Sequence, residues 1–246
     1  YEKKFLDAVT KVDKFFSISK NIKEDLLKVG INENKIIMIP NGVERKKIFH
    51  LKEREKDINK KIYLLSVARF AKEKKGFDLI PLIAKLLNQR KIDFQWTIVG
   101  YNSNQIREIE NMKSFDKNFK YLENINNLEE KFFPHSDLIK VYKDNHIYIN
   151  LARIESFGIT IMEALASGLP VISFDTKGGN ELIKNNYNGI ITKNFSPEQI
   201  VDAIVQYYEN KDLYEKHKKN TISSIENFDL SIITQKTIQG YKEIVD

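Results

Sequence analysis

The sequence predicts an α/β fold: a Rossmann-like parallel sheet of about six strands with helices on both faces. The main observation is an alternation, after residue 60, between short continuous apolar segments and longer segments whose apolar residues recur at helical spacing. Continuous apolar segments are typical of strands that are covered on both faces, as parallel strands are. The chain has 246 residues, of which 41% are hydrophobic and 30% charged, so it can bury a sizeable core.

The first 60 residues predict a lead-in segment that precedes this alternation. It contains two short apolar segments, a helix that Ser19 caps and Gly30 ends, a turn, and a stretch without apolar periodicity. The apolar segments are Lys14–Ser19 and Lys35–Ile39, the turn is Pro40–Gly42, and the stretch is Leu51–Lys60. We therefore predict two units, 1–60 and 61–246, with Leu51–Lys60 as a linker or exposed loop.

From residue 61 onward, strands and helices are expected in turn. The strands are expected at Ile62–Val67, Phe94–Val99, Phe119–Leu122, Ile147–Leu151, Val171–Phe174 and Gly189–Thr192. The helices are expected at Phe77–Leu87, Asn104–Met112, Ser136–Tyr142, Gly158–Ala166, Ser196–Asn210 and over most of the remainder. In such sheets ligands bind beyond the carboxyl ends of the strands, so we expect the functional residues in the loops that follow them.

Several kinds of functional site are excluded or disfavoured by what the sequence lacks. There is no cysteine, which excludes cysteine-ligated metals, and the four histidines show no metal-ligand spacing. The P-loop pattern, the dinucleotide pattern G-x-G-x-x-G and the nucleophile pattern G-x-S-x-G do not occur. The absence of D-x-D argues against a carboxylate-bound metal. We expect neither a metal nor a cofactor.

Charge and the ends of the chain bear on its partners and location. Lys and Arg number 40 against 34 Asp and Glu, a net charge of +6. This suits a nucleotide, another anionic ligand or an acidic membrane surface, but the aromatic residues are not interleaved with basic ones as nucleic-acid binding would favour. No apolar stretch is long enough to span a bilayer. The N-terminus, Tyr1-Glu2-Lys3-Lys4, is neither an initiator Met nor a signal peptide, so we expect a piece of a longer protein. We expect a cytoplasmic protein that binds no nucleic acid, and we leave open a contact with the inner face of the cytoplasmic membrane.

The loop after the first strand of the sheet, Ala68–Gly76, is strongly basic. Arg69 follows the strand end directly, and three lysines, the last of them Lys75, precede Gly76. Such cations can hold a diphosphate, arginine through its planar fork and lysine as a point charge. The alternative is a solvated series of charges, which composition alone favours.

Two glutamates and a helix entry stand together in the segment Arg153–Ile172. Glu155 lies in the loop after a strand, and Glu163 lies eight positions later in the following helix. Too far apart to share a proton or a metal easily, the two carboxylates can instead accept hydrogen bonds from hydroxyls at the two ends of an elongated ligand. Phe157 and Gly158 mark the helix entry between them, and the free amides of Gly158, Ile159 and Thr160 would face an anion. A nucleotide sugar fits this pattern. The alternative for Glu163 is an exposed helix residue or a buried partner of a lysine.

A second glycine-containing loop, Asp175–Glu181, follows the strand at Val171–Phe174. Gly178 and Gly179 are expected to open another helix, with Glu181 in its first turn. The loop predicts a second anion-facing or sugar-facing rim, and ordinary helix-entry chemistry explains it equally well.

Four motifs, taken together, resemble those of a known family. They are IPNGV at 39–43, SVARFAKEKKGF at 66–77, the glutamate pair with E-A-x-A-x-G-x-P-V-I at 155–172, and KGGNELIKNNYNG at 177–189. They resemble the hinge, the Arg and Lys-Gly stretch, the paired-glutamate motif and the Gly-Gly rim of glycosyltransferase family 4. The resemblance covers nearly the whole chain and identifies it as the C-terminal, donor-binding half of a GT-B fold.

The resemblance implies a role for each matching residue. Arg69 and Lys75 match the pair that binds the donor diphosphate, Glu155 the residue that contacts the transferred sugar, and Glu163 the carboxylate on the ribose hydroxyls. The helix entry, whose amides meet the distal phosphate, corresponds to Gly158, Ile159 and Thr160, and Phe157 is a further expected donor-binding residue. We expect Arg69, Lys75 and Glu155 to take part in catalysis, because cations and amides stabilise a departing nucleotide diphosphate.

The resemblance implies a retaining, metal-independent glycosyltransferase of the hexosyltransferase type. It would transfer a sugar from a nucleotide-diphosphate sugar, with UDP as the expected nucleotide and GDP the next, to a glycan or glycolipid in bacterial surface polysaccharide synthesis. The family's acceptor domain precedes this half and is missing here, so we expect residues 1–246 alone to be inactive or weakly active. The family's Val-Gly-x-Gly is replaced by Val99-Gly100-Tyr101-Asn102, near the expected base pocket.

Two other interpretations remain open on the sequence. One is a sugar-nucleotide epimerase that shares the GT-B architecture, which a pH–rate profile would reveal through its acid and base groups. The other is a non-catalytic module that its charge of +6 attracts to acidic lipid or nucleic acid. Binding of that kind would weaken steeply as the salt concentration rises.

Overall fold

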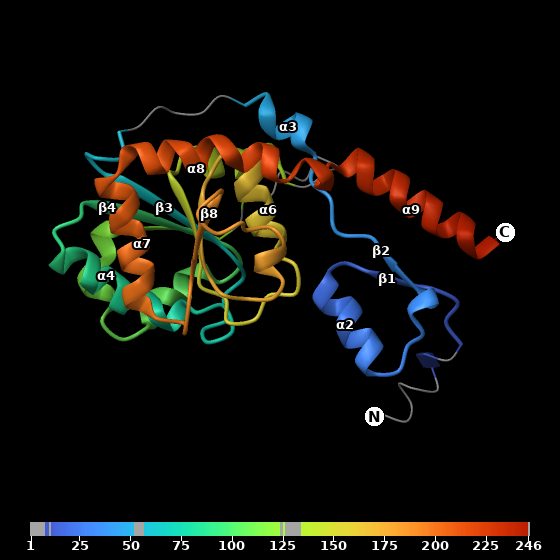
Figure 1. Ribbon diagram of the computed structural model, residues 1–246. Coiled ribbons are helices and arrows are strands. Elements are labelled where there is room, and N and C mark those ends of the chain that lie inside the picture. Colours follow the sequence, from blue (N-terminus) through green and yellow to red (C-terminus); the bar gives the residue numbers. More distant parts are fainter. Residues whose placement is uncertain (1–7, 10, 52–56, 124, 126–133, 246) are drawn as a thin grey trace.

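A parallel sheet is the centre of the computed structural model (Figure 1). Within the described residues (8–9, 11–51, 57–123, 125 and 134–245), this sheet has six strands in the order β5-β4-β3-β6-β7-β8. The strands are β3 (Ile62–Val67), β4 (Phe94–Val99), β5 (Phe119–Leu122), β6 (Ile147–Asn150), β7 (Val171–Phe174) and β8 (Gly189–Thr192). The predicted sheet and its strands are confirmed.

The chain changes direction across the sheet between β3 and β6. The pairing of β3 with β4 runs the full length of both strands, from Ile62 opposite Phe94 to Val67 opposite Val99. On its other side, β3 pairs with β6 only at Leu64 and Leu65. The two strands therefore separate toward their carboxyl ends. A change of direction of this kind opens the crevice in which ligands of doubly wound sheets bind.

Helices cover both faces of the sheet, as predicted. Side chains of β3 alternate between two hydrophobic cores: Ile62 and Leu64 belong to one, and Leu65 to the other. The first core lies under α4 (Ile80–Gln89) and α7 (Pro197–Glu209). The second lies under α3 (Arg45–Phe49), α5 (Ser136–Lys143) and α6 (Ile159–Ala166), and α8 (Lys211–Ser224) packs against both α6 and α7.

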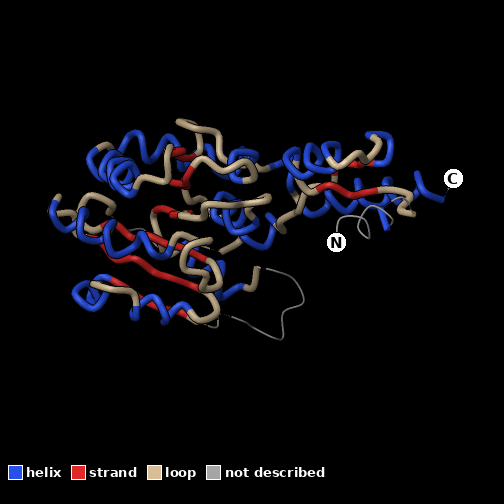
Figure 2. Tube along the Cα trace, turned by 90° about the horizontal axis from the view of Figure 1, so that it is seen from below, coloured by secondary structure: helices blue, strands red, loops and turns tan. Residues whose placement is uncertain are grey.

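A smaller unit lies beside the central sheet (Figure 2). It consists of β1 (Phe15–Ser17), α2 (Lys20–Lys28), a 3₁₀ turn η1 (Glu33–Lys35) and β2 (Ile36–Met38), and β1 pairs with β2 in parallel. The last helix, α9 (Leu230–Val245), returns to this unit, where the rings of Phe16 and Tyr241 meet edge to face at 5.0 Å. The C-terminal helix thus packs on the lead-in segment.

The region around the predicted boundary at residue 60 is described in part. Residues 52–56 of the predicted linker Leu51–Lys60 lie outside the described residues. Ile58 is 1% exposed and belongs to the core under α4 and α7. The end of the predicted linker is therefore anchored in the larger unit.

The predicted helix Asn104–Met112 is wrong. The structure has two 3₁₀ segments in this region, η3 (Ser103–Glu108) and η4 (Met112–Asn118). Asn102 and Asn111, which precede them, have φ values of +60° and +69°, in the left-handed region that asparagine tolerates. Asn111 lies inside the predicted span, and the backbone at Ile109 is extended, so one continuous α-helix over Asn104–Met112 cannot form. None of the described helices combines the length and the apolar character that a membrane-spanning segment needs.

Candidate functional site

The candidate site lies where three loops meet, beyond the carboxyl ends of β3, β6 and β7. The loop after β3 packs on the loop after β6 so closely that a Cβ atom on Gly76 would lie 2.1 Å from the carbonyl oxygen of Leu151. Gly76 also has a φ of +71°, which other residues rarely adopt. The loop after β7 joins them through a 3.1 Å hydrogen bond from the Gly178 amide to the Glu155 carbonyl. Backbone contacts thus hold three distant segments together.

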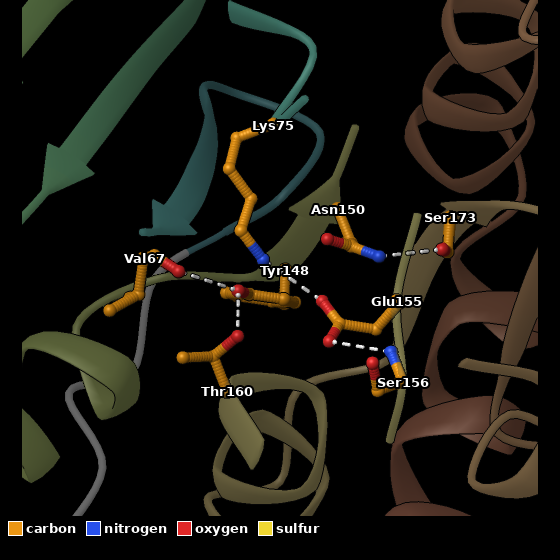
Figure 3. Close-up of polar contacts among 8 residues, drawn as sticks. All are labelled: Val67, Lys75, Tyr148, Asn150, Glu155, Ser156, Thr160 and Ser173. Atoms are coloured by element: carbon orange, nitrogen blue, oxygen red, sulfur yellow. Dashed lines mark hydrogen bonds and ion pairs between the residues drawn. The ribbon is translucent and has the colours of Figure 1, made fainter. Parts of the chain in front are cut away.

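Lys75 and Glu155 form an ion pair at this meeting point (Figure 3). The distance from Lys75 Nζ to Glu155 Oε2 is 3.1 Å. The other carboxylate oxygen accepts a 3.2 Å hydrogen bond from the amide of Ser156. The two side chains are 24% and 16% exposed, so a ligand can still reach them. The pair places one cation and one anion at the same opening, and an anionic ligand would compete with Glu155 for Lys75.

Helix α6 begins beside this ion pair. Gly158 precedes its first residue with a φ of +95°, a conformation that glycine adopts without steric cost. In the part of the chain that the structure describes, no side chain caps this helix. Its first amides therefore have no side-chain acceptor and carry the positive end of the helix dipole. Such a helix start is suited to an anion.

A cleft of about 300 Å³ lies between the start of α6 and the lead-in segment. Its lining residues are Ile18, Asn41, Lys75, Glu155, Ser156, Phe157, Gly158, Ile159 and Thr160. Six of the eight predicted site residues are in this group, and the sequence separates them by as many as 85 positions. Ile18 and Asn41, which follow β1 and β2, were not predicted. The turn predicted at Pro40–Gly42 contains Asn41 and could have indicated that this residue follows the end of a strand.

Glu163, one turn into α6, is outside the described cleft lining and is 7% exposed. Its Oε2 accepts a 2.8 Å hydrogen bond from the Tyr142 hydroxyl. Burial raises the pKa of Glu163 to about 7, against the lowering effect of that hydrogen bond. The carboxyl group therefore titrates near neutral pH. Glu163 is therefore neither a solvated helix residue nor the partner of a lysine, the two alternatives that the sequence left open.

Arg69 lies outside the cleft and the ring of Phe157 is buried, neither of which the sequence indicated. Arg69 is exposed at the carboxyl end of β3, outside the residues described as lining the cleft. Phe157 is only 2% exposed, and its ring packs edge to face on Phe228 at 5.7 Å. The ring of Phe157 therefore anchors the loop in the core, and the backbone is what this residue can offer a ligand.

Buried or ion-paired side chains that sequence reasoning missed support the site from behind. The Tyr148 hydroxyl contacts both Val67 and Thr160 (Figure 3). Arg153 makes a two-pronged ion pair with Asp78, with nitrogen-to-oxygen distances of 2.8 and 2.7 Å. The sequence places Tyr148 in an otherwise aliphatic strand, and because a buried hydroxyl needs a partner, this could have indicated a hydrogen bond there. Sequence spacing holds no comparable signal for the Arg153–Asp78 pair.

The predicted rim, Asp175–Glu181, reaches the smaller unit. Oε1 of Glu181 accepts a 3.4 Å hydrogen bond from the amide of Asn21, in the first turn of α2. The predicted helix after Gly178 is a single 3₁₀ turn, η5 (Gly179–Glu181), and its prediction as a helix is wrong. Asn186 adopts a φ of +58° and Asn185 makes an isolated β-bridge with Gly189, so the backbone before β8 turns instead of continuing a helix. In the described part of the chain, no three His, Asp or Glu side chains are grouped to hold a metal ion.

Comparison with known proteins places this site in a family. The model of the family described as glycosyl transferases group 1 matches residues 47–224, most of the chain and all of the cleft except Ile18 and Asn41. A glycosyltransferase of Methanocaldococcus jannaschii is 29% identical over 243 residues, which are 96% of this chain and 59% of that protein.

Solved structures agree with the family match. A glycosyltransferase from Rickettsia africae superposes with a TM-score of 0.78 at 25% identity, covering 96% of this chain and 64% of that one. The pneumococcal O-GlcNAc transferase GtfA, in complex with UDP and GlcNAc, superposes with a TM-score of 0.74 at 22% identity, covering 97% and 46%. The chain thus spans 46% to 64% of the length of these three proteins. These neighbours have the predicted GT-B architecture, and the chain belongs to the group 1 glycosyl transferases.

Proposed function

We propose that the chain is the donor-binding part of a retaining glycosyltransferase that transfers a sugar from a UDP-sugar to a glycan or glycolipid acceptor. The observation that carries the proposal is the Lys75–Glu155 ion pair beside the uncapped start of α6. This arrangement puts a cation and free amides next to a carboxylate, as a diphosphate joined to a sugar requires. The UDP and GlcNAc bound in the pneumococcal neighbour support the choice of nucleotide.

The diphosphate, the transferred sugar and the ribose of the donor each have a matching group on this chain. The amides of Gly158, Ile159 and Thr160, together with Lys75, face the diphosphate. Arg69 approaches from the exposed end of β3. Glu155 accepts hydrogen bonds from hydroxyls of the transferred sugar, and Glu163 accepts them from the ribose.

The chain's own cations supply the charge that leaving-group departure needs. As the bond between sugar and diphosphate breaks, negative charge accumulates on the diphosphate. Fixed amides and Lys75 stabilise that charge without reorganising, which lowers the barrier. We propose that this makes transfer independent of a metal ion. Acceptor binding, synthesis of bacterial surface polysaccharide and any contact with the inner membrane face belong to the proposal for the whole protein.

Calorimetric titration of the 246-residue chain with UDP, GDP and ADP, with and without Mg²⁺, tests the proposal. We expect UDP to bind with the same affinity in both conditions. At pH 8, above the raised pKa of Glu163, Glu163→Gln should weaken UDP by about tenfold, because one charge-assisted hydrogen bond to the ribose is lost. The exposed Glu209→Gln, at the end of α7, is the matched control and should bind like the unaltered chain. Absence of UDP binding, or equal loss in both variants, would refute the donor site.

A further inference from the structure

The carbonyl of Val67 lies where the sheet ladder between β3 and β6 has already ended. The paired positions of the two strands are Leu64 opposite Ile147 and Leu65 opposite Tyr148, so Val67 lies two residues beyond the last of them. Instead, the hydroxyl of Tyr148 donates a 3.2 Å hydrogen bond to the Val67 carbonyl (Figure 3). A side chain thus replaces the missing ladder bond at the point where the crevice opens.

The same hydroxyl reaches the first turn of α6. The hydroxyl oxygen of Tyr148 lies 2.7 Å from Oγ1 of Thr160, and Tyr148 is 1% exposed. Burial raises the pKa of Tyr148 well above its ordinary value, so the hydroxyl keeps its proton. Because the Val67 carbonyl can only accept, Thr160 donates to Tyr148 whenever Tyr148 donates to Val67. The Thr160 side chain is therefore held toward the core, and its amide is left for the cleft.

Both ends of this connection belong to the anion-binding arrangement. Val67 is two residues before Arg69, and Thr160 is the second residue of α6. The connection therefore joins the strand end that carries a cation to the helix start that carries free amides. A second tyrosine, Tyr142, contacts the same helix at Glu163, and its ring lies 6.0 Å from that of Tyr148. The two tyrosines thus act on different parts of one ligand site.

We propose that Tyr148 is a positioning residue that sets the distance between the end of β3 and the start of α6, and that it thereby determines how tightly the site holds the distal phosphate of a nucleoside diphosphate. The inference rests on the proposed function. It deepens that function by separating the phosphate end of the site from the nucleoside end. Loss of the hydroxyl leaves the ring packed in the core but frees both the strand end and the helix start to move.

The test compares UMP with UDP as titrants, because only UDP carries the distal phosphate. In the unaltered chain we expect UDP to bind more tightly than UMP. Tyr148→Phe should lower UDP affinity by about tenfold and leave UMP affinity unchanged. Tyr207→Phe is the matched control: Tyr207 is also fully buried, and its hydroxyl makes a 2.7 Å contact with His217 Nδ1 far from the cleft. This variant should lose comparable thermal stability and keep both affinities.

A second variant keeps the test decisive if Tyr148→Phe folds poorly. Thr160→Val removes the partner hydroxyl, keeps the side-chain shape and should lower UDP affinity in the same selective way. In the double variant the two losses should not add, because both remove one connection. Additive losses, an unchanged preference for UDP over UMP in Tyr148→Phe, or an equal loss in Tyr207→Phe would overturn the inference. If the unaltered chain does not prefer UDP to UMP, the proposed function fails first and the inference fails with it.

Discussion

The hydroxyl of Tyr142 donates a 2.8 Å hydrogen bond to the carboxylate of Glu163, and both groups are buried. The single hydrogen bond does not compensate for the loss of water, so burial raises the pKa of Glu163 from 4.5 to about 7. Burial also raises the pKa of Tyr142, so the tyrosine remains the donor. A buried carboxylate with a raised pKa lowers the free energy of unfolding when it is ionised, and such groups are typical of binding sites.

Glu163→Gln should remove this cost. The contribution of Glu163 to the free energy of unfolding is greatest below pH 4.5, where its carboxyl is protonated in both the folded and the unfolded state. It falls as pH rises from 4.5 toward 7, because only the unfolded state releases its proton, and the loss is about 3 kcal/mol. The glutamine variant does not titrate, so its advantage over the unaltered chain should grow by that amount between pH 4.5 and pH 8.

Urea unfolding of both proteins at several pH values measures this difference. The difference in the free energy of unfolding is the quantity to compare, because all other titrating groups are common to the two chains. Parallel stability profiles from pH 4.5 to pH 8 would contradict the raised pKa of Glu163.

Lys75→Gln should weaken UDP by about tenfold or more, because a charge-assisted hydrogen bond to the diphosphate is lost. The neighbouring Lys74 is exposed and provides the matched control, since Lys74→Gln changes the net charge equally. Titration with UDP at two salt concentrations measures the effect. A loss of the same size in Lys74→Gln would assign the effect to overall charge instead of the Lys75 position.

Glu155→Gln should separate the sugar from the nucleotide. The variant frees Lys75 from its ion partner and removes a negative charge from the cleft, so UDP affinity should be retained or increased. The additional affinity that the sugar confers should fall, because Glu155 no longer accepts charge-assisted hydrogen bonds from its hydroxyls. Titrations with UDP and UDP-GlcNAc measure the two quantities. A parallel decrease for both ligands would contradict the assigned role of Glu155.

Local patterns were sufficient to predict the sheet and helix α6, whose first residues line the cleft. The strand Phe94–Val99 is predicted from its apolar sequence because both of its faces are buried in every such sheet. The entry of α6 is predicted because glycine and the two glutamates stand at fixed spacing along one segment. Pattern reasoning failed at Asn104–Met112, where left-handed Asn111 and the extended backbone at Ile109 outweigh a polar sequence of good helix formers.

The supporting contacts could not be predicted, because they join residues that are distant in the sequence. Arg153 and Asp78 are 75 positions apart, and nothing near either residue specifies the other. Aromatic and aliphatic residues fit the strand pattern at Tyr148 equally well, so the pattern does not indicate which residues its hydroxyl contacts. The exposure of Arg69 depends on how the loop after β3 folds, which its series of charges does not determine.

The Arg153–Asp78 ion pair provides the last prediction. Arg153 also donates from its side chain to the Glu73 carbonyl and from its amide to the Lys74 carbonyl, so it holds the loop that carries Lys75. The two side chains are 30% and 25% exposed, and a double-mutant cycle with Arg153→Met and Asp78→Asn should give a coupling energy of about 1 kcal/mol in unfolding.

If this pair acts on the ligand through Lys75, Arg153→Met should lower UDP affinity by roughly threefold, and the loss should vanish when Lys75→Gln is already present. The exposed pair Arg90–Asp202, 2.6 Å apart between α4 and α7, is the matched control. Arg90→Met should leave UDP affinity unchanged, because that pair contacts no part of the cleft. An effect of Arg153→Met that persists in the Lys75→Gln background would mean that Arg153 acts on the ligand directly or through the loop after β6, and positioning of Lys75 would then be refuted.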